Sequence, residues 1–227
     1  MRKFREFLIE KLILLCGLAS IFFVVIIFLF LLREGLALFK IITPGQFLLG
    51  SKWYPISEPP DLGILPLILG SILVTLGAAV ISIPIGVGCA IYIAEVAPFK
   101  LKEILKAGIE LLAAIPSVVL GFIGMVTLVP WVKTIFNIPT GLTALSGSVM
   151  LAFMAMPTIV SIAEDALYSV PKTYKEGALA LGATRWQAIW RVMLPAASSG
   201  ILAAVMLGIG RVIGETMAVM MITGNSA

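Results

Sequence analysis

The chain has 227 residues, of which 60% are hydrophobic and only 12% are charged, with a net charge of +4 and no histidine. A soluble domain has about 25% charged residues, so this composition excludes an ordinary soluble domain and predicts an integral membrane protein. The missing histidine excludes His-ligated metal sites and Ser-His-Asp triads. The two cysteines are too few for a disulfide framework or a cysteine-rich metal site.

Five uncharged stretches are long enough to cross a membrane. They comprise residues 12–32, 62–94, 111–132, 134–163 and 192–210. A helix needs about 20 residues to cross the hydrocarbon core, and backbone polar groups must be satisfied within the segment in lipid, so each stretch is predicted to be a helix. The first is longer than the apolar core of a signal peptide, so we interpret it as an uncleaved span. The predicted fold class is an all-α polytopic transmembrane helical bundle with five spans.

The basic residues predict the orientation of these spans. Eleven of them fall on one side of the membrane, namely Arg2, Lys3, Arg5, Lys11, Lys100, Lys102, Lys106, Lys172, Lys175, Arg185 and Arg191. The other side receives only Arg33, Lys40, Lys52 and Lys133. Because cytoplasmic loops carry the excess of Lys and Arg, the N-terminus is expected in the cytoplasm. We therefore expect one transmembrane domain over residues 1–227, with a cytoplasmic N-terminus at 1–11, an external segment at 33–65 and a cytoplasmic loop at 164–195.

The cytoplasmic loop has the pattern of two short helices. Capping-box spacings occur at residues 173–176 and 184–187, Gly182 separates the two helices, and Pro195 is expected to end the unit. A helical pair this apolar outside the membrane must lie against something. It either folds back on its own bundle or the lipid headgroups, or it provides a docking surface for a cytoplasmic partner.

The same loop resembles the EAA signature of ABC importer permeases, which is E-A-A, three residues, G, nine residues and I-x-L-P. Gly177 replaces an alanine of the signature and Val192 replaces its isoleucine. The resemblance implies that the loop couples to an ATP-binding subunit. The residues implied in that coupling are Glu176, Gly177, Ala178, Gly182, Leu194 and Pro195.

Two further blocks resemble the PstC-type permease subunit of the phosphate-specific ABC importer. They are Ile109–Ser117 and Gly208–Val219. PstA-type permeases share a G-R-x-x-G-E-T-like stretch, so the PstC likeness depends on residues 111–117 and 217–219. The resemblance implies phosphate import across a bacterial or archaeal inner membrane. It also implies a second permease as heterodimer partner, a dimer of ATP-binding subunits and an external phosphate-binding protein.

Arg211 and Glu215 are the candidate substrate-path residues. At positions i and i+4 of one helix they are expected to lie within reach of each other, with Glu215 holding Arg211 when no anion is present. Ionisable residues at membrane depth are costly and often mark a pathway, and a guanidinium group matches two phosphate oxygens. The alternative is that Arg211 extends to the outer membrane interface. Gly210 and Gly214 beside this pair have a spacing that allows close helix packing.

The sequence leaves other functions open. A permease for another oxyanion, such as sulfate or molybdate, is the nearest alternative. The others are an intramembrane enzyme that uses Arg211 as an electrophilic clamp and a passive scaffold whose loop binds a protein. No P-loop occurs in the chain, so ATP hydrolysis is expected on a separate subunit and the chain itself is not expected to be an enzyme. No cofactor, metal or nucleic acid is expected to bind. Because PstC-type permeases have six spans, a sixth span and a short tail are expected after Ala227.

Overall fold

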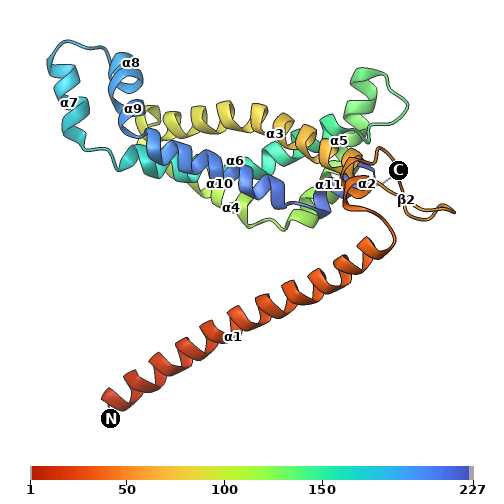
Figure 1. The fold of residues 1–227 in the computed structure, drawn as a ribbon. Coiled ribbons are helices and arrows are strands. Elements are labelled where there is room, and N and C mark those ends of the chain that lie inside the picture. Colours follow the sequence, from red (N-terminus) through yellow and green to blue (C-terminus); the bar gives the residue numbers. More distant parts are fainter. Residues whose placement is uncertain (1, 225–227) are drawn as a thin grey trace. The chain divides into compact units, whose positions relative to one another are not determined.

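The computed structural model describes residues 2–224, and almost all of its regular structure is helical (Figure 1). By the contacts within the chain it divides into two compact units, one ending at Leu67 and the other beginning at Ile68. Division by internal contacts does not test whether both units belong to one permease domain, so a single domain over residues 1–227 stays a prediction. The all-α fold class is confirmed.

The first unit contains one long helix and a short folded segment. Its elements are α1 (Arg2–Ala37), η1 (Leu38–Lys40), α2 (Pro44–Leu49), β1 (Trp53–Tyr54) and β2 (Asp61–Leu62). α1 is apolar on all sides, and its side chains from Glu6 onward are exposed except that of Ala19, as expected of a helix surrounded by lipid. β1 and β2 form an antiparallel hairpin. Gly50 and Gly63 meet beside it so closely that a Cβ on either would overlap the other's backbone.

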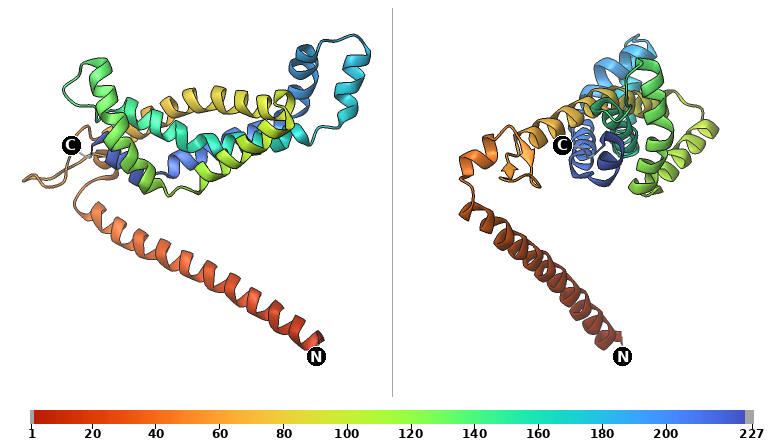
Figure 2. Two further views of the ribbon diagram at one scale, coloured as in Figure 1. Left: turned by 180° about the vertical axis from the view of Figure 1, so that it is seen from behind. Right: turned by 90° about the vertical axis from the view of Figure 1, so that its right-hand side faces the viewer.

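The second unit is a bundle of helices of unequal length. Its elements are α3 (Leu65–Ile91), η2 (Tyr92–Val96), α4 (Phe99–Ala114), α5 (Ser117–Phe136), α6 (Ala144–Tyr168), α7 (Lys172–Ala180), α8 (Arg185–Ala188), η3 (Ile189–Met193), α9 (Leu194–Ala196), α10 (Ser198–Gly214) and α11 (Met217–Thr223); η2 and η3 are π-helical turns. Figures 1 and 2 show α7 and α8 at one end of this unit, and α11 with the α5–α6 connection at the other.

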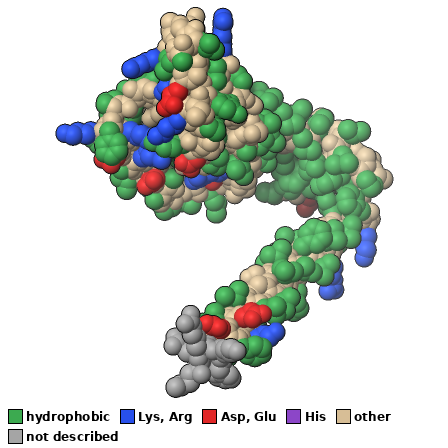
Figure 3. Space-filling view, turned by 90° about the vertical axis from the view of Figure 1, so that its left-hand side faces the viewer, with side chains coloured by type: hydrophobic (Ala, Val, Ile, Leu, Met, Phe, Trp, Pro, Cys, Tyr) green, Lys and Arg blue, Asp and Glu red, His purple; other side chains and the backbone are tan. Residues whose placement is uncertain are grey.

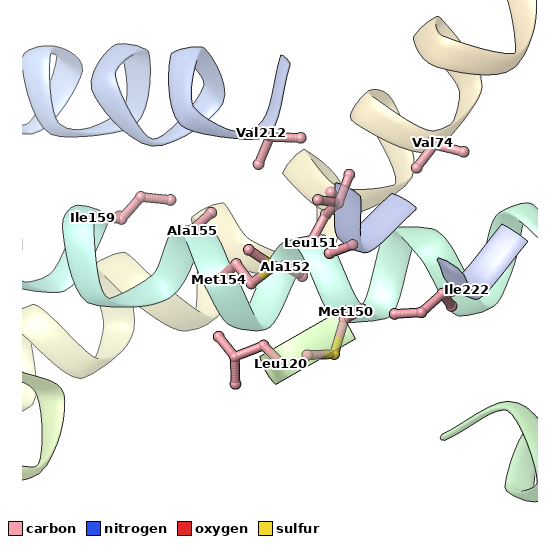
Figure 4. Packing of buried hydrophobic residues seen from close by; sticks show 12 residues of the cluster. Val74, Leu120, Met150, Leu151, Ala152, Met154, Ala155, Ile159, Val212 and Ile222 are labelled. Carbon is pink, nitrogen blue, oxygen red and sulfur yellow. The ribbon is translucent and has the colours of Figure 1, made fainter. Parts of the chain in front are cut away.

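α6 is the central helix of the second unit, with 14 of its 25 residues buried. α10 packs along it, and Gly208 lies so close to Ile159 that a Cβ would overlap that side chain. α3 approaches the same helix through Gly86, which is also against Ile159. Figure 4 shows the resulting core, in which side chains from α3, α5, α10 and α11 surround those of α6. Small residues at these contacts let the helix backbones approach closely.

The predicted spans agree only in part with the helices observed. Within residues 2–224, four helices are long and apolar enough to cross a membrane, within Glu6–Lys40, Leu65–Val96, Ser117–Phe136 and Ala144–Tyr168. A fifth span is reached only if Arg185–Ala196 and Ser198–Gly214, which are bent by 71° at their junction, count as one. The prediction of one continuous helix over 111–132 is wrong. α4 ends at Ala114 and α5 begins at Ser117, because Pro116 disfavours helical backbone at the residue before it.

A buried ion-pair cluster joins α4 to α6. Glu164 on α6 is 2% exposed, and its two carboxylate oxygens lie 3.0 Å from Nζ of Lys102 and 2.6 Å from Nζ of Lys106. The hydrogen bond to Glu164 raises the pKa of Lys106 above its ordinary value of 10.5, although burial acts in the opposite direction. Lys102 also lies over the ring of Tyr168, 3.9 Å from its centroid. Lys106 therefore stays charged at neutral pH, and the two ion pairs hold α4 against α6.

This cluster predicts a non-additive effect on stability. Replacing both Lys102 and Lys106 by methionine leaves Glu164 buried without a partner, which should cost about 3–5 kcal/mol. Adding Glu164→Leu to that pair should recover most of the loss, because an apolar trio needs no pairing. Thermal unfolding of the detergent-solubilised protein measures both changes.

Asp165→Asn is the matched control for this prediction. Asp165 lies 3.9 Å from Lys106 and is 70% exposed, so its loss should change stability by less than about 1 kcal/mol. If the variant with both Lys102 and Lys106 replaced by methionine were as stable as the wild type, Glu164 would not be a buried charge that needs pairing.

Candidate functional site

The loop helices lie at one end of the second unit, and their sequence explains their shape. Gly182 separates α7 from α8 with a φ of +86°, a backbone conformation that favours glycine. The capping box at 184–187 is confirmed: Thr184 N–H donates to the Gln187 side chain at 2.9 Å, and Gln187 N–H donates to the Thr184 hydroxyl at 3.2 Å.

One detail of the loop prediction is wrong. The capping box at 173–176 does not form, because α7 begins at Lys172 with Pro171 at its N-cap, which places Thr173 inside the helix. The expected end of the unit at Pro195 is confirmed to within one residue. α9 ends at Ala196, and the chain then bends by 71° into α10.

The inner side of the loop helices packs on their own bundle. Ile189 and Met193 are each 3% exposed and belong to a buried cluster with Ile91, Leu167 and Val170. Neither side chain is therefore available to a docked partner. This packing anchors the loop to the ends of α3 and α6.

The outer side of the loop helices is apolar and uncovered. Leu181 is 92% exposed, Trp186 59% and Trp190 51%, and the two indole rings stack edge to face with centroids 5.6 Å apart. We call these three residues, with Tyr174, the outer face of the loop. Of the implied coupling residues, Glu176, Gly177, Gly182 and Pro195 are exposed, whereas Ala178 and Leu194 are half-buried.

A groove of about 340 Å³ separates α7 from the ends of α3 and α6. Glu176 lines it, and so do Glu95 and Lys175, which form an ion pair with each other. The role of Glu95 was not predicted. The only signal for it in the sequence is that Glu95 ends the uncharged stretch 62–94. Figure 3 shows the Lys and Arg side chains gathered over this end of the unit, together with several carboxylates.

Arg211 lies in the last turn of α10, about 20 Å along the helix from its first residue, Ser198. The side chain is half-buried, and its Nη1 donates a hydrogen bond of 3.2 Å to Oγ1 of Thr158 on α6. The candidate path residue and the loop helices therefore occupy different parts of the unit, and α10 connects them.

The expected pairing of Arg211 with Glu215 is wrong. α10 ends at Gly214, and Glu215 has an extended backbone with φ −83° and ψ 116°, so the two residues are not on one helical face. The Glu215 carboxylate accepts a hydrogen bond of 3.2 Å from the backbone N–H of Ala218 at the start of α11. An N-terminal turn of a helix has free N–H groups and favours a negative charge. Within residues 2–224, the carboxylate binds this N–H and forms no ion pair with Arg211.

The expected close packing at Gly210 and Gly214 is also not found among the described residues of this chain. A Cβ at either position would meet nothing within 4 Å. Ile213 beside them is 67% exposed, and Met217 57%. The glycine of this segment that packs closely is Gly208. The face of α10 next to Arg211 is therefore uncovered in the structure of the single chain.

Comparison with known proteins places the chain among transport proteins. The family model of the binding-protein-dependent transport system inner membrane component matches residues 82–227. The probable ABC transporter permease protein YqgH of Bacillus subtilis is 44% identical over 213 residues, covering 93% of this chain and 69% of that protein. The phosphate transport system permease protein PstC of Haemophilus influenzae is 38% identical over 202 residues, covering 80% of this chain and 63% of that protein.

A solved structure of the MetNI methionine ABC transporter in an inward-facing conformation has a similar fold. It matches with a TM-score of 0.57 and 24% identity, over 70% of this chain and 74% of that one. The chain spans between 61% and 69% of the length of the first curated relatives that it matches. On the family match and on these relatives, the chain belongs to the inner membrane components of binding-protein-dependent transport systems, the multi-pass permease subunits of ABC transporters.

Proposed function

We propose that this chain is a permease subunit of an ATP-driven importer of inorganic phosphate, and that Arg211 lines the anion path. The observation that carries the proposal is the environment of Arg211, whose hydrogen-bond partner is the neutral hydroxyl of Thr158. A guanidinium group is always protonated and presents a fork of N–H donors that fits two oxygens of a phosphate. Its charge is left available for an anion.

Two kinds of support favour phosphate transport over the other functions that the sequence leaves open. Membership of a transporter permease family favours transport over an intramembrane enzyme and over a passive scaffold. Relatives named as phosphate transport permeases cover four fifths of this chain, which favours phosphate over sulfate or molybdate. Glu215 stays a proposed path residue because it follows Arg211 by four positions, although its carboxylate accepts from the N–H of Ala218.

We propose partners for the surfaces that are exposed in the described residues. ATP-binding subunits are proposed to dock on the outer face of the loop, because exposed indole and leucine side chains are costly in water. A second permease subunit is proposed to cover α10 beside Gly210 and Gly214. An external phosphate-binding protein would meet the segment 33–65, and ATP hydrolysis would occur on the ATP-binding subunits, since the chain has no P-loop.

The packing suggests how motion would reach the anion path. A shift of the loop helices would be transmitted by Ile189 and Met193 to the ends of α3 and α6. α9 leads directly into α10, so the same shift would also move the helix that carries Arg211. Alternating access would then be a displacement of α10 and its neighbours around Arg211.

The orientation of the chain can be tested by cysteine labelling. In a background with Cys16→Ser and Cys89→Ala, a cysteine at Lys172 should react only from the cytoplasmic side, and one at Lys52 only from the outside. Right-side-out and inside-out vesicles treated with a membrane-impermeant thiol reagent measure this. Reaction of both positions from the same side would contradict the proposed topology.

The coupling role can be tested by substitutions at Gly182 and Glu176 of the loop. Gly182→Val strains a backbone with φ +86°, at a cost of about 1–3 kcal/mol, and should uncouple uptake from ATP hydrolysis without preventing membrane insertion. Glu176→Lys should do the same by reversing a charge in the groove beside α7. Phosphate uptake per assembled complex is the measurement.

Gly108→Ala, on α4 and outside the coupling loop, is the matched control for the coupling variants. A Cβ at this position would meet nothing within 4 Å, and the residue is already helical, so alanine should leave coupling unchanged. Wild-type uptake by both Gly182→Val and Glu176→Lys would refute the coupling role.

The main test of the proposal is phosphate uptake by variants of Arg211. Arg211→Lys keeps the charge but loses the bidentate fork, so uptake should fall while the complex still assembles. Arg211→Gln loses the charge as well, so phosphate uptake should fall further, by about tenfold or more. Radiolabelled phosphate uptake, normalised to assembled complex, measures both variants. Arg33→Gln, which changes an exposed arginine of α1, controls for lost charge alone. Wild-type uptake by Arg211→Gln would remove Arg211 from the anion path.

A further inference from the structure

We infer that Thr158 is a second anion-binding residue, whose hydroxyl donates a hydrogen bond to an oxygen of the same tetrahedral oxyanion that Arg211 binds. The inference rests on the proposed function, because it adds a residue from α6 to the anion path on α10. It assigns a chemical role to a side chain that no motif in the sequence indicates.

The direction of the observed hydrogen bond leaves the Thr158 hydroxyl with a free proton. A guanidinium group can only donate, so in the 3.2 Å contact between Nη1 of Arg211 and Oγ1 of Thr158 the threonine oxygen is the acceptor. Its own hydrogen must then point elsewhere. A hydroxyl that accepts from a cation is also polarised toward donation, since linked hydrogen bonds strengthen one another.

Three of the five other threonines in the helices of this unit use that proton within their own helix; Thr75 and Thr173 do not. Thr127, Thr134 and Thr223 donate to the carbonyl four residues earlier, at 2.7, 2.9 and 2.8 Å. This is the usual arrangement for a hydroxyl in an apolar helix. Within residues 2–224, the hydroxyl of Thr158 donates to no protein acceptor. It is therefore oriented by Arg211 for an acceptor that the chain does not supply.

The charge around this pair indicates what that acceptor is. In the described part of the chain Arg211 forms no ion pair, and the nearby carboxylate of Glu215 accepts instead from the N–H of Ala218. A cation at membrane depth with a neutral partner favours an anion as its missing counter-charge. An anion with several unprotonated oxygens can accept from both the guanidinium and the hydroxyl, as a phosphate can.

The pair is accessible to such an ion. Arg211 and Thr158 are both half-buried, and the adjacent face of α10 is open at Gly210 and Gly214. The two donors come from different helices, so their separation depends on the position of α10 against α6. A displacement of α10 would part the donors and release the ion, which suits passage better than storage.

The test compares threonine variants that differ only in the hydroxyl. Thr158→Val is nearly isosteric and removes it, whereas Thr158→Ser keeps it. Thr127→Val is the matched control, because the Thr127 hydroxyl bonds its own helix. Each variant is assembled into the complete transporter in proteoliposomes with phosphate-loaded binding protein. Radiolabelled phosphate uptake and ATP hydrolysis are then measured on the same vesicles.

We expect Thr158→Val to reduce the phosphate delivered per ATP about tenfold, the effect of losing one hydrogen bond to a charged group. ATP hydrolysis should remain stimulated by the binding protein. Thr158→Ser and Thr127→Val should stay within about twofold of wild type. A role in structure alone would instead lower uptake and ATP hydrolysis together, or would affect the serine variant as much as the valine variant; either result overturns the inference. So does wild-type uptake by Thr158→Val.

Two further arms make the outcome decisive. If the valine variant does not assemble, Thr158→Ala replaces it as a hydroxyl-free variant with less volume. Arg211→Gln is measured in parallel. Wild-type transport by Arg211→Gln would defeat the proposed function itself, whereas impaired transport by Arg211→Gln with normal transport by Thr158→Val would defeat only the role of Thr158.

Discussion

The close contact between α6 and α10 is the constraint on which the rest of the second unit depends. It exists because Gly208 has no side chain where Ile159 fills the space between the helices, and because Gly200 likewise leaves room for Ala166. In lipid, helix association depends on such backbone proximity rather than on apolar burial alone. The contact also fixes where Arg211 points, since its hydrogen-bond partner Thr158 lies one residue before Ile159. Packing and the candidate anion site therefore share one interface.

Two charged residues of this unit differ in whether another charged group of the chain pairs with them. Glu164 is almost fully buried, and Nζ of Lys102 and Nζ of Lys106 lie 3.0 and 2.6 Å from its carboxylate oxygens. Its charge is therefore neutralised within the bundle, and the ion pairs fix α4 against α6. Arg211 has only a neutral hydroxyl as partner. A buried charge that is fully paired favours one arrangement, whereas one with a neutral partner is free to respond to an ion. The two sites therefore suit different roles, although both lie on α6 or α10.

The sequence allowed prediction of the features that residues close together in the chain determine, such as apolar helices and helix caps. Gaps between charges identify apolar helices, and Thr184 with Gln187 forms its capping box because both residues are local to one helix start. Residues 173–176 have the same spacing but form no box, since the preceding proline takes the cap position. The contacts of Thr158 and Glu164 could not be found, because each joins residues more than 50 positions apart. The EAA-like loop was recognisable because its spacing lies within 20 residues.

The helix break at Glu215 is the step that converts an apparent ion pair into a candidate binding site. On a continuous helix, a carboxylate four residues after Arg211 would compete with any anion for the guanidinium. Because α10 stops at Gly214 and the chain turns into α11, the carboxylate instead caps the new helix through the N–H of Ala218. That contact stabilises α11 and removes the competitor from Arg211. A short interruption in a membrane helix thereby leaves an arginine whose charge an incoming oxyanion can satisfy, as broken helices do where they line a path through a membrane.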